Sequence, residues 1–277
     1  MRSDSLFAAF GAAASFSSNV LFALYFFASI CVYLALIFQI SARASPLGGA
    51  PTKSFGLPEA IVAGALIFLF LRAIGASVSR SSVELNARDL LANLIFTVVM
   101  VLFIATFLKL RGIDLSSAAG FFRLNFLRAV SMGTILLLAA YPLIALSEAV
   151  TQSLFGSGSS KQNVVELFSG SRTIEQRIMI IVFAVAIAPV VEEFLFRFFL
   201  YGVLKRYFGR FLGITVNALL FAAAHTHFPS FVPLFVLGSC FTIAYEWSGS
   251  ILVAMTMHSL FNTVSLTVLA FPELFPQ

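Results

Sequence analysis

Residues 189–197 read PVVEEFLFR and place two adjacent glutamates and an arginine inside one of the most apolar stretches of the chain. Of the 277 residues, 60% are hydrophobic and only 10% are charged. Ionisable side chains at membrane depth are energetically costly, so they usually face a cavity or the interior of a helix bundle and mark a functional site. The question is therefore which fold surrounds these three groups and which chemistry requires them.

The composition around this stretch is that of a membrane protein. Mean hydropathy is +1.01, and apolar runs of about 20 residues, long enough to cross a bilayer, recur along the chain. Hydrocarbon offers no partners to backbone N–H and C=O groups, so spans form helices or closed barrels. The polar–apolar alternation of barrel strands is missing. We therefore expect an all-α fold, a polytopic bundle of about eight transmembrane helices over residues 18–40, 57–78, 91–110, 126–146, 174–207, 212–225, 231–247 and 251–269.

A polar linker, FGSGSSKQN at residues 155–163, divides the chain into two halves. We expect a single integral membrane domain in which residues 1–155 supply about four supporting spans. Residues 170–277 then supply the spans that carry the chemistry. The segment MRSDSLFAAFGAAAS at the amino terminus is interpreted as a short interfacial lead, because a spanning segment follows it at once.

The net charge is +5. The basic residues lie mostly between apolar runs, where they set membrane topology, so nucleic acid is not an expected partner. Cys31 and Cys240 form no spacing pattern and predict neither a disulfide nor a CxxC metal site. We expect a multi-pass protein of the plasma (inner) membrane with both termini outside. The larger group of basic residues then faces the cytoplasm: Arg43, Lys53, Lys109, Arg111, Arg123, Lys205, Arg206 and Arg210.

Helical geometry gives the two glutamates different surroundings. Glu193 and Arg197 are four residues apart, so they share a helix face and can pair. Glu192 points about 100° away from Glu193. Pro189 removes a backbone donor just upstream, which kinks the helix or leaves a carbonyl free. One carboxylate can therefore be balanced by arginine while the other points elsewhere.

The remaining polar residues at membrane depth lie further along the last third of the chain. His225 ends the predicted sixth span, and His258 and Asn262 are four residues apart on one face of the last span. His227 fits no pattern and is interpreted as a bystander. Three helices thus offer a carboxylate pair, a histidine, and a histidine with a carboxamide.

Two chemistries fit these residues. Glu192 beside an imidazole can take a proton from water, while a histidine and Asn262 can stabilise an oxyanion. Alternatively, Glu192, His225 and His258 can hold a divalent metal such as zinc, which activates water directly. Neither a GxSxG elbow nor an HExxH helix is present. The candidate catalytic residues are Glu192, Glu193, Arg197, His225, His258 and Asn262.

Three motifs make the chain resemble the type II CAAX prenyl endopeptidases and their bacterial relatives, the CPBP family of intramembrane proteases. Residues 192–197 match EExxxR, residues 221–225 match FxxxH, and residues 258–262 match HxxxN. Residues 245–251, YEWSGSI, resemble the family's approach to the third motif, with serine in place of the usual threonine. The resemblance covers roughly residues 175–270, while residues 1–150 match only as apolar spans.

The resemblance implies a bundle of about eight helices around a cavity. Glu192 and His225 would activate water, and His258 and Asn262 would stabilise the oxyanion. The family motifs are compatible with a metal-free mechanism and with zinc, so a divalent metal on Glu192, His225 and His258 and no metal at all both stay open.

Glu193 and Arg197 would shape the site. The implied activity is cleavage of a membrane-embedded or lipidated peptide or protein, prenylated CAAX proteins among the candidates, inside the lipid bilayer. For a bacterial chain, small membrane-associated peptides are more in keeping than prenylated proteins. The alternative is a non-catalytic scaffold, a bacteriocin-immunity-type protein or a transporter that retains the pocket. Transport is disfavoured, because the polar groups are confined to one half of the chain.

Overall fold

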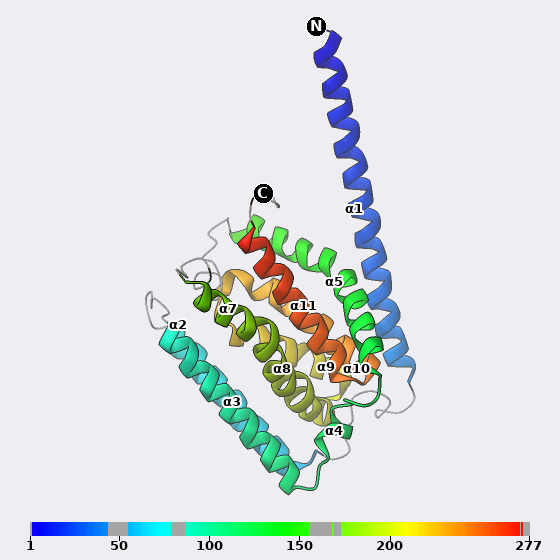
Figure 1. Ribbon diagram of the computed structural model, residues 1–277. Helices are drawn as coiled ribbons and strands as arrows, with labels where there is room; N and C mark the ends of the chain where they lie inside the picture. The colour runs from blue at the N-terminus through cyan, green and yellow to red at the C-terminus, as the bar shows by residue number, and fades with distance from the viewer. Residues whose placement is uncertain are drawn as a thin grey trace.

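The computed structural model describes residues 2–43, 55–78, 87–155, 168, 173–271 and 273. Within these ranges every regular element is a helix, as expected (Figure 1). The elements are α1 Arg2–Ala42, α2 Leu57–Val78, α3 Ala87–Leu110, α4 Leu115–Ala118, α5 Phe126–Phe155, α7 Ile174–Val182, η1 Phe183–Ile187, α8 Ala188–Glu193, η2 Phe194–Leu200, α9 Tyr201–Ala224, η3 Phe228–Ser230, α10 Phe231–Ser248 and α11 Ile251–Ala270. The linker at 156–163 lies outside the described residues.

Six helical segments in the described part of the chain are long and apolar enough to cross a membrane, and a shorter apolar helix covers Ile95–Leu110. Large apolar side chains also cover the outside of the bundle; for example, Phe38 is 73% exposed and Leu127 is 75% exposed. An apolar surface of this extent requires lipid around it. The chain is an integral multi-pass membrane protein, and the expected number of eight spans is approximate.

The six candidates differ from the expected eight in two places: α3 counts only as the shorter apolar helix Ile95–Leu110, and the expected fifth and sixth spans form one helical segment, Ile174–Ala224, interrupted at Gly209. Gly209 has φ 79° and ψ 176°, which lie outside the helical region and which a residue without a Cβ adopts at no steric cost. Beyond it the chain returns beside itself, since a Cβ on Gly213 would lie 3.1 Å from the backbone nitrogen of Lys205. The predicted boundary between the fifth and sixth spans therefore corresponds to this turn.

Side-chain contacts gather the basic residues at one end of the bundle. Arg210 donates to the carbonyl oxygen of Ile40 at 2.8 Å, and Arg43 donates to that of Trp247 at 2.9 Å. Lys205 forms a buried ion pair with Glu246 at 2.7 Å. The ends of α1, the Gly209 turn and the end of α10 therefore lie together, as expected for residues of one membrane face. The assignment of that face to the cytoplasm stays a prediction.

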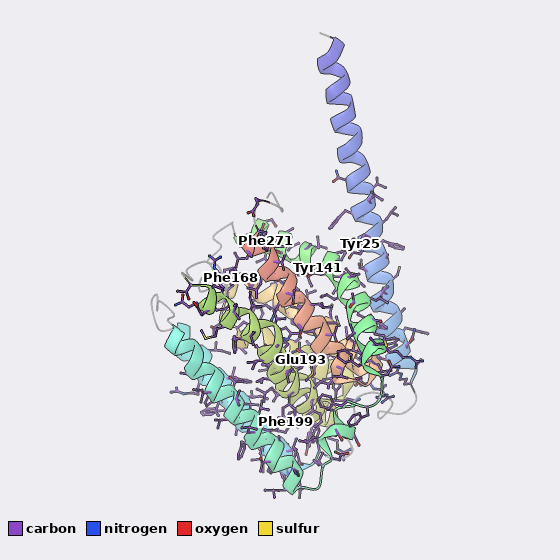
Figure 2. The ribbon with its side chains drawn as sticks, in the orientation of Figure 1. Tyr25, Tyr141, Phe168, Glu193, Phe199 and Phe271 are labelled. Atoms are coloured by element: carbon purple, nitrogen blue, oxygen red, sulfur yellow. The ribbon has the colours of Figure 1, made fainter. Side chains whose placement is uncertain are left out.

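The helix that carries the last motif, α11, lies between α5 on one side and the η1–α8 segment on the other (Figure 1). Its contact with α5 is close because Gly133 faces it: a Cβ there would lie 2.7 Å from the Cβ of Thr256. Small residues at such crossings let membrane helices approach through van der Waals packing. This packing places α11 against the EExxxR helix, with Glu193 inside the bundle (Figure 2).

Candidate active site

The helix that carries the two glutamates departs from regular α-geometry on both sides of them. In η1 the N–H of Ala188 donates to the carbonyl of Phe183, and after η2 the N–H of Tyr201 donates to that of Phe196, five residues back in each case. These are π-helical turns, which are rare and often lie at functional sites. The six-residue helix α8 between them ends at Glu193.

Glu193 and Arg197 form the expected ion pair. The Arg197 Nε and the Glu193 Oε2 are 3.1 Å apart, and both side chains are fully buried. The guanidinium also lies 4.2 Å from the ring centroid of Phe221 and donates to the carbonyl of Gly238 at 3.4 Å. A buried charge is tolerated only when it is paired in this way. The pair thus fixes Glu193 in the bundle interior.

His258 contacts both glutamates. Its Nδ1 lies 2.8 Å from the Oε1 of Glu193, and its Nε2 lies 4.0 Å from the Oε2 of Glu192. A carboxylate can only accept, so the Nδ1 of His258 carries the proton. The Nε2 of the neutral ring then presents its lone pair to Glu192.

His225 faces the same carboxylate from the opposite helix. Its Nδ1 lies 2.8 Å from the backbone oxygen of Phe221, and its Nε2 lies 3.9 Å from the Oε2 of Glu192. The carbonyl of Phe221 accepts the Nδ1 proton, so this Nε2 also presents a lone pair. His225 caps the end of α9, and Thr226, with φ 51°, turns the chain sharply after it.

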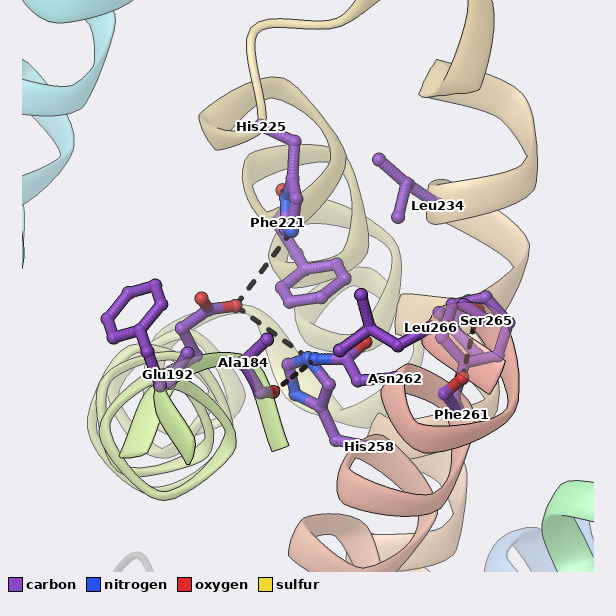
Figure 3. Close-up of a pocket in the computed structure, with 13 residues that line it drawn as sticks. Ala184, Glu192, Phe221, His225, Leu234, His258, Phe261, Asn262, Ser265 and Leu266 are labelled. Carbon is purple, nitrogen blue, oxygen red and sulfur yellow. Dashed lines mark hydrogen bonds and ion pairs between the residues drawn. The ribbon is translucent and has the colours of Figure 1, made fainter. Parts of the chain in front are cut away.

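Glu192 therefore lies between two imidazole nitrogens (Figure 3). Its side chain is 26% exposed, yet its Oε2 is buried and has no hydrogen-bond partner among the described residues. A buried acceptor without a donor is costly. It borders a cavity of about 160 Å³ whose lining also includes His225, His258 and Asn262. Because no described residue donates a hydrogen bond to this oxygen, a donor from outside the protein is required, and water is the simplest one.

Asn262 is held in the cavity by a hydrogen bond to a backbone carbonyl, a contact that was not predicted. Its Nδ2 donates to the carbonyl oxygen of Ala184 in η1 at 2.8 Å (Figure 3). Because the carbonyl can only accept, the amide nitrogen of Asn262 is the atom that faces Ala184, and its second hydrogen is left for another acceptor. The sequence signal for this contact was Pro189, which was expected either to kink the helix or to leave a carbonyl free.

The six candidate catalytic residues thus meet in one place, four of them on the cavity and the Glu193–Arg197 pair directly behind it. Phe221, which entered the sequence analysis only as a motif letter, was missed as a site residue. Its ring centroid lies 4.7 Å from that of His225 and 5.9 Å from that of His258. His227 lies outside this group, with its Nδ1 2.7 Å from the Oγ of Ser230.

The three predicted metal ligands match a divalent ion in chemical type but not in spacing. Glu192, His225 and His258 offer one carboxylate oxygen and two Nε2 atoms, and each Nδ1–H is anchored on an oxygen, the arrangement that supports metal-bound histidines. Tetrahedral zinc ligands, however, lie about 3.3–3.4 Å apart, and the separations here are 3.9 and 4.0 Å. Among the described residues, no group of three or more His, Cys, Asp or Glu is close enough to hold a metal ion. The donor set suits a divalent ion, but its spacing is wider than a bound ion would hold.

Comparisons with known proteins were made on the whole chain. Residues 174–264 match the profile of the family described as type II CAAX prenyl endopeptidase Rce1-like. The chain is 31% identical over 121 residues to the membrane-embedded CAAX protease MroQ of Staphylococcus aureus (strain USA300). That alignment covers 41% of this chain and 47% of MroQ, so the chain spans about half the length of this relative. No solved structure matches with significance.

The matched residues 174–264 include every motif of the site, from Glu192 to Asn262. They also include both π-helical turns and the Gly209 turn, which together position those side chains. The match to the Rce1-like family therefore covers the helices that build the cavity. Residues 174–264 thus match the Rce1-like family of type II CAAX prenyl endopeptidases, and this match and the likeness to MroQ together support a protease of the CPBP family.

Proposed function

We propose that the protein is an intramembrane endopeptidase that hydrolyses a peptide bond of a membrane-associated substrate with water activated by Glu192. The observation that carries the proposal is the set of atoms around the Oε2 of Glu192. This oxygen is buried, has no hydrogen-bond partner in the part of the chain that the structure describes, and lies 3.9 and 4.0 Å from the Nε2 atoms of His225 and His258. Three acceptors converging on one point suit a water molecule that donates both of its hydrogens.

The first step is attack by this water on the scissile carbonyl carbon. Water donates one hydrogen to the Oε2 of Glu192 and the other to the Nε2 of His225, so its oxygen lone pair is directed away from both. As the C–O bond forms, Glu192 takes the proton and the carbonyl π electrons move to oxygen. The product of this step is a tetrahedral oxyanion with a protonated Glu192.

The oxyanion requires donors, and the cavity supplies them from α11. The second Nδ2 hydrogen of Asn262 is available for this role, and the Nε2 of His258 donates once the ring has taken a proton from solvent and become an imidazolium. Glu193, 2.8 Å from the other nitrogen of that ring, balances the charge so created. The C–N bond then breaks, and the proton on Glu192 passes to the leaving amine. The second water proton stays on the new carboxyl group, so the balanced products are an amine and a carboxylic acid, which then loses its proton to water.

A divalent ion on Glu192, His225 and His258 would supply a polarised, more acidic water when bound. The roles of Asn262 and of the Glu193–Arg197 pair are the same with or without it, because these residues contact the oxyanion or hold His258. The oxyanion donors are therefore assigned to the same residues whether or not an ion is bound.

The walls of the cavity favour an apolar substrate segment. Apart from the polar residues already described, its lining consists mainly of apolar side chains: Phe183, Leu234, Leu237, Phe261 and Leu266. A lipidated or membrane-embedded peptide that reaches the site from the bilayer fits such a lining. The name of MroQ, a CAAX protease, makes a carboxy-terminal CAAX segment the first substrate to examine.

The test uses purified protein in detergent with two fluorogenic CAAX peptides, one prenylated and one not. Wild type is compared with Glu192→Gln, His258→Ala and the control Glu148→Gln, an exposed glutamate on α5. We expect cleavage by wild type and by the control, and a loss of roughly 10²–10⁴-fold in the two site variants. Cleavage that survives Glu192→Gln in a folded protein would refute the proposed role of this residue.

A non-catalytic scaffold predicts a different pattern in the same experiment. Folded wild type would then cleave neither peptide, and Glu192→Gln would leave capture of a membrane partner intact. Because Glu192→Gln keeps the size of the side chain while it replaces the basic carboxylate by a neutral amide, it separates the two hypotheses better than a truncation.

A further inference from the structure

We infer that Pro189 is a positioning residue: by leaving the carbonyl of Ala184 without a backbone donor, it creates the acceptor that orients the amide of Asn262. The hydrogen-bond part of this inference stands on the structure alone. Its effect on catalysis rests on the proposed function, in which Asn262 donates to the oxyanion. Pro189 itself is buried and contributes no polar atom to the cavity.

The helical register explains why the carbonyl is free. In η1 the N–H of Ala188 donates to Phe183, five residues back, instead of to Ala184. If the same five-residue pattern continued, the N–H of residue 189 would donate to the carbonyl of Ala184. Residue 189 is proline, which has no N–H. A buried carbonyl without a donor is costly at membrane depth, so a partner must come from another helix. Asn262 on α11 provides it at 2.8 Å.

This contact also decides which way the amide of Asn262 faces. The two ends of a carboxamide have the same shape but opposite hydrogen-bonding roles. An acceptor at Ala184 selects the orientation in which Nδ2 faces η1 and Oδ1 faces away. Ala184 and Asn262 both line the cavity, and Asn262 lies one helical turn after His258 on α11 (Figure 3). Without the free carbonyl, the two orientations of Asn262 would be closer in energy, and the donor would be aimed correctly for only part of the time.

The same device occurs a second time in the bundle, away from the site. Pro142 lies inside α5, and in regular α-geometry its missing N–H is the one that would donate to Leu138. The hydroxyl of Tyr25 on α1 donates to the carbonyl of Leu138 instead. Two helix prolines thus each free a carbonyl that then binds a side chain of a neighbouring helix. The second pair supplies a matched control, since it carries no candidate catalytic residue.

The first test measures stability and needs no substrate. Thermal unfolding in detergent is followed for wild type, Pro189→Ala, Asn262→Ala and the double variant. We expect Asn262→Ala to lower Tm by roughly 2–4 °C when residue 189 is proline. With alanine at 189 we expect a loss of less than about 1 °C, because the restored N–H occupies the Ala184 carbonyl. Equal losses in both backgrounds would overturn the inference.

The second test measures cleavage of the prenylated peptide by the same four proteins, which form a double-mutant cycle. Pro189→Ala is expected to lower kcat about tenfold with little change in KM, because a donor to the oxyanion acts in the transition state. In the Asn262→Ala background the same change should lower kcat by less than about twofold. A tenfold loss in both backgrounds would show that Pro189 acts independently of Asn262. Pro189→Val, which also restores the N–H, replaces Pro189→Ala if the latter fails to fold.

The two tests also separate this inference from the proposed function. If wild type cleaves no peptide, the proposed function fails while the stability cycle still decides whether Pro189 and Asn262 are coupled. The control cycle of Pro142→Ala with Tyr25→Phe should show coupling in Tm and no coupling in kcat. Coupling in kcat for the control pair would mean that any helix proline affects catalysis, which would contradict a specific role for Pro189.

Discussion

Glu193 and His258 lie on different helices and 65 residues apart in sequence, yet the Oε1 of Glu193 accepts the Nδ1 proton of His258 at 2.8 Å. The second oxygen of the same carboxylate lies 3.1 Å from the Nε of Arg197. One buried carboxylate therefore both balances the arginine and orients the imidazole. This dual role distinguishes Glu193 from Glu192, its neighbour in sequence, which lies on the cavity.

Glu193→Gln should destabilise the protein more than any other single change in the site. It leaves the fully buried guanidinium of Arg197 without its counter-charge, and breaking a buried ion pair from one side costs about 3–5 kcal/mol. The free energy of unfolding in detergent measures this loss. The double variant Glu193→Leu with Arg197→Leu should be less destabilised than Glu193→Gln, because no uncompensated charge remains. A double variant that is as unstable as the sum of the two single changes would contradict the pairing.

Glu192→Gln should have the opposite profile, with a loss of activity and no loss of stability. Its Oε2 is buried and no described residue donates a hydrogen bond to it, so removing the charge relieves an unfavourable interaction, as is common for catalytic groups. We expect Tm to stay the same or rise, while cleavage falls roughly 10²–10⁴-fold. Thermal unfolding and peptide cleavage of the same preparation test this. A marked drop in Tm would mean that Glu192 has a structural partner.

The sequence predicted the local geometry of the site well. The four-residue spacing of Glu193 and Arg197 predicted their pairing, and the 100° step predicted that Glu192 would face elsewhere. Both follow from helical periodicity, which acts within one segment. The meeting of Glu192 with His225 depends instead on the turn at Gly209, which lies 17 residues after Glu192 and 16 residues before His225. A predicted span boundary in this region was enough to suggest the hairpin.

The π-helical turns and the contact of Asn262 with Ala184 were beyond sequence reasoning. Each π turn adds one residue to a helical turn, so every later side chain of the helix points in a different direction. No periodicity in the apolar residues indicates such a turn. Pro189 predicted either a kink or a free carbonyl, and nothing local indicated that the partner of that carbonyl would lie on α11. The choice of partner depends on how α11 packs against η1, which tertiary contacts decide.

The metal question can be tested with a chelator. The separations of 3.9 and 4.0 Å from the Oε2 of Glu192 to the two Nε2 atoms exceed those of zinc ligands by about half an ångström. We therefore expect peptide cleavage to be unchanged after incubation with a strong chelator and dialysis. Loss of activity that zinc restores would contradict this expectation and would assign a metal to Glu192, His225 and His258.

The packing around Phe221 predicts a substitution that acts through the positions of the histidines. Gly238 on α10 faces the ring of Phe221, and a Cβ at this glycine would lie 2.9 Å from the ring. The ring in turn lies 4.2 Å from the Arg197 guanidinium and packs against His225. Gly238→Ala should therefore displace Phe221 and lower kcat roughly tenfold or more, since small misplacements of catalytic groups are costly.

The matched control is Gly64→Ala on α2, where a Cβ would meet no atom within 4 Å. Alanine is favoured over glycine within a helix by about 1 kcal/mol, so this variant should be as stable as wild type or more stable, with unchanged kcat. Comparing kcat and Tm for the two variants separates a local effect on the site from a general effect of adding a methyl group. If Gly238→Ala retains wild-type kcat while it lowers Tm, Phe221 supports the fold only and does not position the histidines.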